Sequence, residues 1–184
     1  MLLGQNVNSY GRDLTLKLRG TEVSAESSEL FGEAWVRGPH TARPLFSDLL
    51  RSVAEVSGIR RVRYTSPHPK DLRPETIDAM AQIPEVCEHL HLPLQSGSDD
   101  VLSAMHRGYT ADKYIEKVDA ARQQIPDLDL STDIIVGFHG DTDVDFERPL
   151  EVAARVRSDN AYTFVCTPRP GTEAAELLQR FVPA

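Results

Sequence analysis

The chain has 184 residues, a length typical of one domain. Its 40% hydrophobic and 26% charged residues indicate a globular protein rather than a disordered one, and no apolar run approaches the roughly 18 residues of a membrane span. A net charge of -8 argues against binding nucleic acid through the overall field, although a local basic patch is compatible with it. The N-terminus has no signal-peptide pattern, so we expect a cytoplasmic protein without a membrane partner.

The two cysteines, Cys87 and Cys166, lie far apart in the sequence and form no C-x-x-C motif. This spacing argues against a disulfide framework and against a zinc site, which needs more ligands in closer groups. We therefore expect two reduced thiols that pack as small hydrophobic side chains.

The first half of the chain contains a strand end, a long loop, a helix and a second strand. Residues 2–7 have the pattern of a buried strand that ends in polar residues. Residues 12–44 combine glycines with a Ser/Glu-rich run, which is typical of a long irregular loop. Apolar residues at helical spacing predict a helix over 45–56, and residues 59–65 follow as a strand.

Helices and strands alternate through the second half. Pro74 is suited to begin a helix, and residues 86–94 form the next predicted strand. The sequence then predicts a helix over 114–125, strands over 128–138 and 161–166, a helix between these strands and a short terminal helix. Pro149 lies inside the penultimate helix, where we expect it to remove a hydrogen bond and kink the helix at a cost of about 3 kcal/mol.

Five apolar strands interleaved with helices predict an α/β fold with a parallel sheet and right-handed crossovers. An open doubly wound sheet and a partial (β/α) barrel both fit this pattern. Polar residues recur at the same end of every strand, and in a barrel these ends converge on one face, so the barrel is favoured. These polar residues are Gln5 and Asn6; Ser66 and His68; Gln95, Ser96 and Ser98; Gly137, Gly140 and Asp141; and Thr167 and Arg169.

Six segments carry a family resemblance. They are LLGQNVNSYG at 2–11, TSPHP at 65–69, LHLPLQSGS at 90–98, RGYT at 107–110, TDIIVGF at 132–138 and PRPGT at 168–172. Together and in this order they resemble the tRNA methylthiotransferases of the radical S-adenosylmethionine (SAM) superfamily, most closely the 2-methylthio-N6-dimethylallyladenosine synthase group. The resemblance covers nearly the whole chain apart from the loop.

The resemblance implies that residues 1–184 are a single partial radical SAM domain, a TIM-type (β/α) barrel with about five parallel strands and its first strand missing. In the full-length family, SAM binds against a 4Fe-4S cluster held by a C-x-x-x-C-x-x-C loop, and a methylthio group is added to C2 of N6-isopentenyladenosine next to the anticodon of tRNA. That loop, the N-terminal domain and the C-terminal RNA-binding domain have no counterpart in this sequence.

The cysteine count limits what the chain does alone. Such clusters are ligated by thiolates, and Cys87 and Cys166 do not supply three at the required spacing, so we expect an inactive fragment. Two alternatives remain open. The chain is a non-catalytic half-barrel remnant that acts as a binding or interaction module, or it is a barrel enzyme in which His68 and Asp141 form an acid/base pair.

The resemblance also assigns candidate site residues. Most would contact the cofactor, and two, His68 and Arg169, would face the substrate. Ser98 is also suited to cap a helix, and glycines at a strand-to-helix turn need no ligand to explain them. The candidate cofactor-binding residues are Gln5, Asn6, Gln95, Ser96, Ser98, Arg107, Gly137, Phe138 and Gly140.

Some positions depart from the family or admit a second interpretation. His139 and Asp141 stand where members usually carry Pro and Glu, which places the affinity for SAM in doubt. His89 and His91 alternate along a strand at a spacing that suits a metal, but the lack of a third ligand favours a structural role. The cluster at residues 60–63 contains three arginines that suit phosphate contacts or a solvated strand edge.

Overall fold

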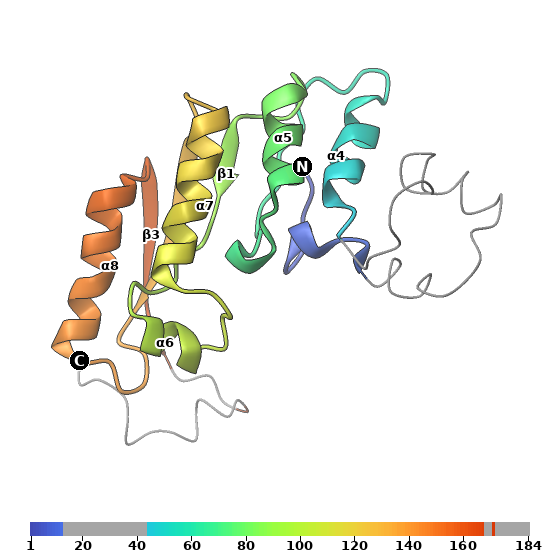
Figure 1. Ribbon diagram of the computed structural model, residues 1–184. Coiled ribbons are helices and arrows are strands. Elements are labelled where there is room, and N and C mark those ends of the chain that lie inside the picture. The colour runs from blue at the N-terminus through green and yellow to red at the C-terminus, as the bar shows by residue number, and fades with distance from the viewer. Residues whose placement is uncertain (13–43, 168–170, 172–184) are drawn as a thin grey trace.

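A computed structural model describes residues 1–12, 44–167 and 171 (Figure 1). The predicted loop over 12–44 therefore lies almost entirely outside the described residues, as do Arg169 and the terminal helix. Within the described residues, helices and strands alternate in the predicted order. The elements are η1 (Val7–Ser9), α4 (Phe46–Ala54), η2 (Pro69–Asp71), α5 (Pro74–Gln82), β1 (His89–His91), α6 (Asp99–Ala104), α7 (Ala111–Gln124), β2 (Asp129–Val136), α8 (Asp143–Val156) and β3 (Asn160–Val165).

The sheet is parallel throughout the described residues. β1, β2 and β3 form three adjacent strands in that order, and all their pairings are parallel. Two single parallel bridges, Leu2 to Tyr64 and Val62 to Val86, extend the same alignment beyond β1. Five chain segments therefore lie side by side in sequence order, as the alternating pattern predicts, although only three of them form regular strands.

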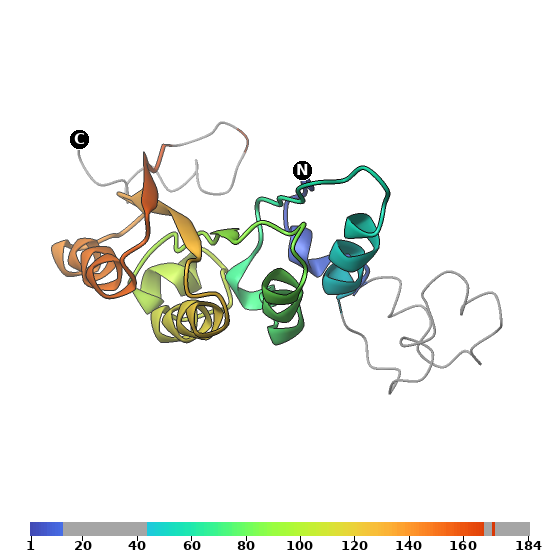
Figure 2. The same cartoon turned by 90° about the horizontal axis from the view of Figure 1, so that it is seen from above.

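Helices cover one face of this sheet. Seen from above, α4, α5, α7 and α8 follow one another along one side of a curved row of strands (Figure 2). This arrangement is that of part of a (β/α) barrel, in which the helices form the outer layer. In the described part of the chain the other face of the sheet carries no helix, and all six residues of β3 are exposed.

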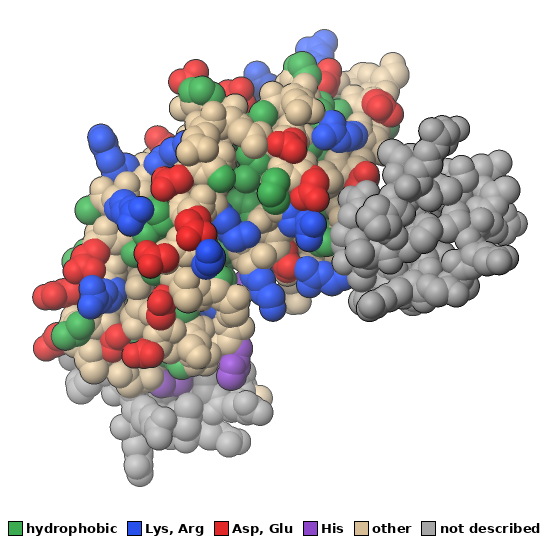
Figure 3. All heavy atoms as spheres, viewed as in Figure 1, with side chains coloured by type: hydrophobic (Ala, Val, Ile, Leu, Met, Phe, Trp, Pro, Cys, Tyr) green, Lys and Arg blue, Asp and Glu red, His purple; other side chains and the backbone are tan. Residues whose placement is uncertain are grey.

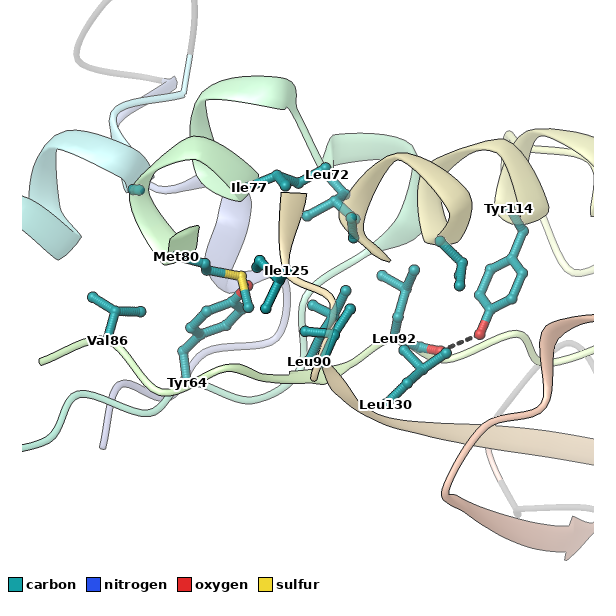
Figure 4. Packing of buried hydrophobic residues seen from close by; sticks show 14 of the residues in the cluster. Tyr64, Leu72, Ile77, Met80, Val86, Leu90, Leu92, Tyr114, Ile125 and Leu130 are labelled. Carbon is teal, nitrogen blue, oxygen red and sulfur yellow. Dashed lines mark hydrogen bonds between the residues drawn. The ribbon is translucent and has the colours of Figure 1, made fainter. Parts of the chain in front are cut away.

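The hydrophobic core lies between the sheet and the helices (Figure 4). Leu90 and Leu130 are fully buried in neighbouring strands and point toward the helices. Tyr114 reaches into the core from α7, where its hydroxyl donates a hydrogen bond of 2.9 Å to the backbone oxygen of Leu92. Burial raises the pKa of Tyr114 to about 12, so the hydroxyl remains a donor.

The strand that begins with β1 carries one extra residue opposite β2. His91 pairs with Ser131 and Gln95 pairs with Ile134, so four steps on one strand face three on the other. Pro93 lies inside this bulge and has no N–H to donate. The amide of Leu94 donates instead to the Thr132 hydroxyl at 2.9 Å, which satisfies the displaced backbone group.

Side-chain caps mark the starts of α6, α7 and α8. Thr110 accepts from the amide of Lys113 at the start of α7, and Ser98 accepts from the amide of Val101 at the start of α6. At the start of α8, Thr142 and Asp145 bond to each other's backbone amides, which is a capping box.

Pro149 is accommodated inside α8. The helix continues through Pro149 from Asp143 to Val156, so the expected kink does not end it. The proline side chain is buried, and the backbone of Arg148 and Pro149 packs directly against Gly97: a Cβ on Gly97 would lie 2.4–2.5 Å from that backbone. Packing explains the proline at this position. The close approach of the α8 backbone explains why residue 97 is a glycine.

Two strand predictions are corrected by the structure. Residues 2–7 do not form a continuous strand end, because only Leu2 pairs and Val7 already belongs to η1. The predicted strand 86–94 is interrupted, since regular pairing covers only His89–His91 and the bulge follows.

We expect Gly97→Ala to destabilise the fold by about 1–3 kcal/mol, because the added methyl group overlaps backbone atoms of α8 that have no rotamer to move into. The midpoint of urea unfolding measures this effect. Gly4→Ala is the matched control, since its Cβ would lie 3.5 Å or more from its neighbours. Equal stability of the two variants would contradict the prediction.

Candidate functional site

Three neighbouring segments of the sheet end in a residue with left-handed backbone conformation. Ser66, Gln95 and Gly137 have φ angles of 60°, 66° and 69°. Only glycine adopts this conformation without steric cost, so at Ser66 and Gln95 the surrounding contacts hold the backbone. The three turns lie at the same end of the sheet, because the segments are parallel and adjacent. They define a candidate site at the carboxyl ends of the strands.

Gln95 and Arg107 form the centre of this site. The side chain of Gln95 is buried, and its oxygen accepts a hydrogen bond of 2.8 Å from the Arg107 guanidinium. Tyr109 supports the same strand end, because its hydroxyl donates 2.9 Å to the backbone oxygen of Leu94. Within residues 1–12, 44–167 and 171, Arg107 forms no ion pair with a carboxylate, and its guanidinium is held by Gln95, an arrangement suited to an anionic ligand.

His68 lies next to this pair. Its ring packs edge-on against Tyr109 with 5.5 Å between the centroids. The amide group of Asn8 holds its backbone in both directions, since it accepts from the His68 N–H at 2.8 Å and donates to the His68 carbonyl at 3.0 Å. Burial lowers the pKa of His68, and the positive charges of Arg107 and Lys70 lower it further against the opposing effect of Asp71.

The side chain of Asn6 is directed to a structural contact. It donates 2.7 Å to Asp71, which also forms an ion pair with Arg12. Burial alone would raise the pKa of Asp71, but the bonds from Asn6 and Arg12 hold it below its ordinary value. Gln5, by contrast, is exposed. A cofactor contact in this segment would therefore come from the backbone or from Gln5.

Ser96 and Ser98 stabilise the turn after Gln95. The hydroxyl of Ser96 accepts from the amide of Ser98 at 3.2 Å. Ser98 caps α6 and also donates 2.6 Å to Asp145 at the start of α8. Ser98 lines a hollow of about 510 Å³ among α6, α7 and α8 on the helix side. The capping role considered for Ser98 is the one that its contacts support.

The turn after β2 forms a second group of candidate residues. The amide of Phe138 donates 2.9 Å to Asp141, whose own amide donates back to Phe138. Gly137 and Gly140 both have positive φ, and no atom lies within 4 Å of a Cβ placed on either, so their backbone conformation rather than close packing requires glycine. Burial raises the pKa of Asp141, against the lowering effect of the Phe138 amide.

The structure thus brings most predicted site residues to one end of the sheet, in two groups. Gln95, Arg107 and His68 form one group, and the turn 137–141 forms the other. His68 and Asp141 make their contacts in different groups, and the segment that ends at Gln95 lies between them. An acid/base pair of these two residues therefore has no direct contact to support it.

Several residues of the site carry no signal that sequence reasoning detected. Asn8, Asp71 and Tyr109 hold the site residues in place through bonds to segments remote in the sequence. Asn8 and Tyr109 do belong to segments that carry the family resemblance. Their roles depend on which backbone groups the fold brings beside them, so residue type alone does not reveal them.

His89 and His91 face aspartates of β2 on the face of the sheet that lacks helices. His91 forms a hydrogen bond of 2.9 Å with Ser131 and one of 3.3 Å with Asp133. His89 lies 3.8 Å from Asp129. These cross-strand contacts account for the alternation along the strand and agree with the structural role that the sequence favours.

Comparison with known proteins identifies the family. The sequence profile of the radical SAM superfamily matches residues 34–153. This chain belongs to the radical SAM superfamily. In fold it is similar to coproporphyrinogen III oxidase (HemN) from Escherichia coli, a radical SAM enzyme, with a TM-score of 0.52 at 15% identity over 74% of this chain and 31% of that one. The half-barrel interpretation of the sheet is therefore confirmed at the level of fold.

Two curated relatives of this radical SAM chain are tRNA-2-methylthio-N(6)-dimethylallyladenosine synthases. The protein from Mycobacterium sp. (strain JLS) is 46% identical over 179 residues, which cover 96% of this chain and 32% of the relative. The protein from Carboxydothermus hydrogenoformans is 44% identical over 176 residues, covering 96% of the chain and 34% of the relative. The chain therefore spans about a third of the length of these relatives.

The helices that the structure describes include none that is long and apolar enough to cross a membrane.

We expect His68 to make the fold sensitive to mild acid. In the folded chain the pKa of His68 lies below its ordinary value of 6.5. As the pH drops below about 6.5, the unfolded chain therefore binds a proton more readily than the folded chain does, and the free energy of unfolding falls. His68→Asn keeps an acceptor for the Lys70 amide and should flatten the unfolding free energy between pH 7 and 5. The exposed His106, changed to Asn, is the control. An unchanged pH profile for the His68 variant would contradict this assignment.

Proposed function

We propose that this chain is part of a tRNA methylthiotransferase and that the carboxyl ends of its strands form one wall of the SAM site. The observation that carries the proposal is the convergence of the Gln95–Arg107 pair and the 137–141 turn at one end of a parallel half-barrel. The superfamily membership supports SAM as the ligand, and the names of the relatives support a tRNA nucleoside as the substrate.

The chemistry of the donors fits the cofactor. Arg107 offers N–H groups for the carboxylate of the methionine part. The backbone at Gly137 is open, which permits close approach of a flat ring. In the described part of the chain Asp141 Oδ1 is buried without a hydrogen-bond partner, and it can accept from an amino group. Asp141 is a carboxylate like the glutamate usual in the family, so His139 is the larger departure.

The roles of the individual residues follow from these contacts. Arg107 would bind one end of SAM, and Gln95 would fix the direction of the guanidinium. The turn 137–141 would hold the adenine end, and His68 would face the substrate; Arg169, the other substrate candidate, lies outside the described residues. The cofactor, when bound, supplies the radical chemistry, and the protein binds, orients and excludes water.

The cluster fits this chain less well than SAM does. Its two cysteines lie at opposite ends of the parallel sheet, since Cys87 precedes β1 and Cys166 follows β3. They cannot act as one set of thiolate ligands. A half-barrel that binds or interacts without catalysis is the second candidate function, and it needs no cluster ligands from this chain.

We expect saturable binding of SAM to this chain by calorimetry, and Arg107→Ala should weaken it at least about tenfold, because a hydrogen bond to a charged group contributes roughly 1.5–3 kcal/mol. Arg51→Ala, at an exposed position of α4, should leave the affinity unchanged. Failure of the unaltered chain to bind SAM, or equal affinities of the two variants, would contradict the proposal that these strand ends form one wall of the SAM site.

Reconstitution with iron and sulfide tests whether this chain by itself ligates a cluster, which neither candidate function requires of it. We expect no stoichiometric cluster, because the two thiols are too far apart to ligate one. The double variant Cys87→Ala/Cys166→Ala should retain as little iron as the unaltered chain. Stoichiometric iron with visible charge-transfer absorption, lost in the double variant, would show that this expectation is wrong.

A further inference from the structure

A group of basic side chains borders the candidate site on the helix side. It consists of Lys70, Arg73, Arg107, Lys113 and Lys117, named here the basic rim. We propose that the basic rim binds the phosphate backbone of RNA and thereby presents a nucleotide to the strand ends. The inference rests on the proposed function, because it names the surface by which that site would receive an RNA substrate.

Contacts show that the basic rim is one surface, although its members come from three parts of the chain. Lys117 of α7 donates 2.6 Å to the backbone oxygen of Leu72, which follows η2. Burial lowers the pKa of Lys117, Asp71 opposes this, and the charges of Arg73 and Lys113 lower it further. Arg73 and Lys113 are therefore close enough to Lys117 to repel it.

Lys70 joins the loop before α7 to this surface. A Cβ on Gly108 would lie 3.4 Å from the Lys70 ammonium, so this cation lies directly over the loop that follows Arg107. The Lys70 amide donates 3.2 Å to the His68 ring, and that ring packs against Tyr109, two residues after Arg107. These contacts connect Lys70 to the centre of the candidate site.

The nearby carboxylates only partly neutralise the basic rim. Asp71 is buried, with 6% of its side chain exposed, and is engaged by Asn6 and Arg12. Arg73 pairs with Glu75 at 3.2 Å and Lys113 with Glu116 at 2.7 Å, but all four side chains are exposed, and such pairs contribute little and are screened by salt. Lys and Arg side chains gather over the lower ends of α5 and α7 in Figure 3.

An RNA backbone fits this surface better than a single anion does. The cations come from residues 70–73, from the loop at residue 107 and from α7, and a polyanion can contact more of them at once than a single anion can. Because the chain carries a net charge of -8, such binding is local and should depend steeply on salt. The arginines at 60–63 precede the strand ends in the sequence and do not belong to the basic rim.

The test is the fluorescence anisotropy of a labelled RNA stem-loop titrated with the full chain at several salt concentrations. The variant Lys70→Ala/Lys113→Ala removes two exposed charges of the basic rim. We expect it to lower the slope of log affinity against log salt by about 1.4–1.8, since each phosphate contact contributes roughly 0.7 on single strands and 0.9 on duplexes. The affinity at low salt should fall at least tenfold.

The control is Arg148→Ala/Arg155→Ala on α8, which changes the net charge equally. Arg148 pairs with Glu151 at i,i+3 as Lys113 pairs with Glu116, so the two double variants are matched. An unchanged slope in the basic-rim variant, an equal loss in both variants or no RNA binding by the unaltered chain overturns the proposal. SAM binding measured on the same samples reports separately on the cofactor wall, so failure of one proposal is distinguishable from failure of the other.

Discussion

The bulge around Pro93 is the constraint on which the candidate site depends. Because proline has no N–H, the ladder with β2 is interrupted there, and the hydroxyls of Thr132 and Tyr114 bond to the backbone groups that lose their partners. Pairing resumes at Gln95, one residue out of step, in a left-handed conformation. This turn places the Gln95 side chain within hydrogen-bond distance of Arg107. A site built on a rigid strand end is held more precisely than one on a free loop.

At the same end of the sheet, hydrogen bonds hold buried polar groups in place and offset the free-energy cost of burying them. Asn8 binds both backbone groups of His68, and Asn6 and Arg12 satisfy the buried Asp71. These bonds fix the geometry of His68 and Asp71, although in the described part of the chain the Oδ1 atom of Asn6 is buried without a hydrogen-bond partner. In this part of the chain a network of bonds between remote segments takes the place of a continuous ladder, and the chain can end its strands in conformations that non-glycine residues rarely adopt.

Charge is distributed unevenly over this acidic protein. The net charge is -8, whereas the basic rim lies beside the strand ends. At long range the net negative charge of the protein repels anions, whereas at short range the basic rim attracts them. This combination favours specific over non-specific contact. The half-barrel and the basic rim thus form one functional edge, while the hydrophobic core on the helix side provides the stability that keeps this edge in position.

The sequence by itself determined the alternation of helices and strands, the parallel sheet, the suitability of Ser98 as a helix cap and the end of the sheet where polar residues collect, because these follow from local periodicity and from residue type. It also indicated the family, through short segments at the strand ends. Only the tertiary structure decided that Pro93 lies in a bulge, that Ser98 bonds to Asp145 instead of facing the site, that Pro149 packs on Gly97, and that Lys70 and Lys117 share a surface. Each of these depends on which groups meet across large sequence separations, and that is set by the packing of the whole chain rather than by any one segment.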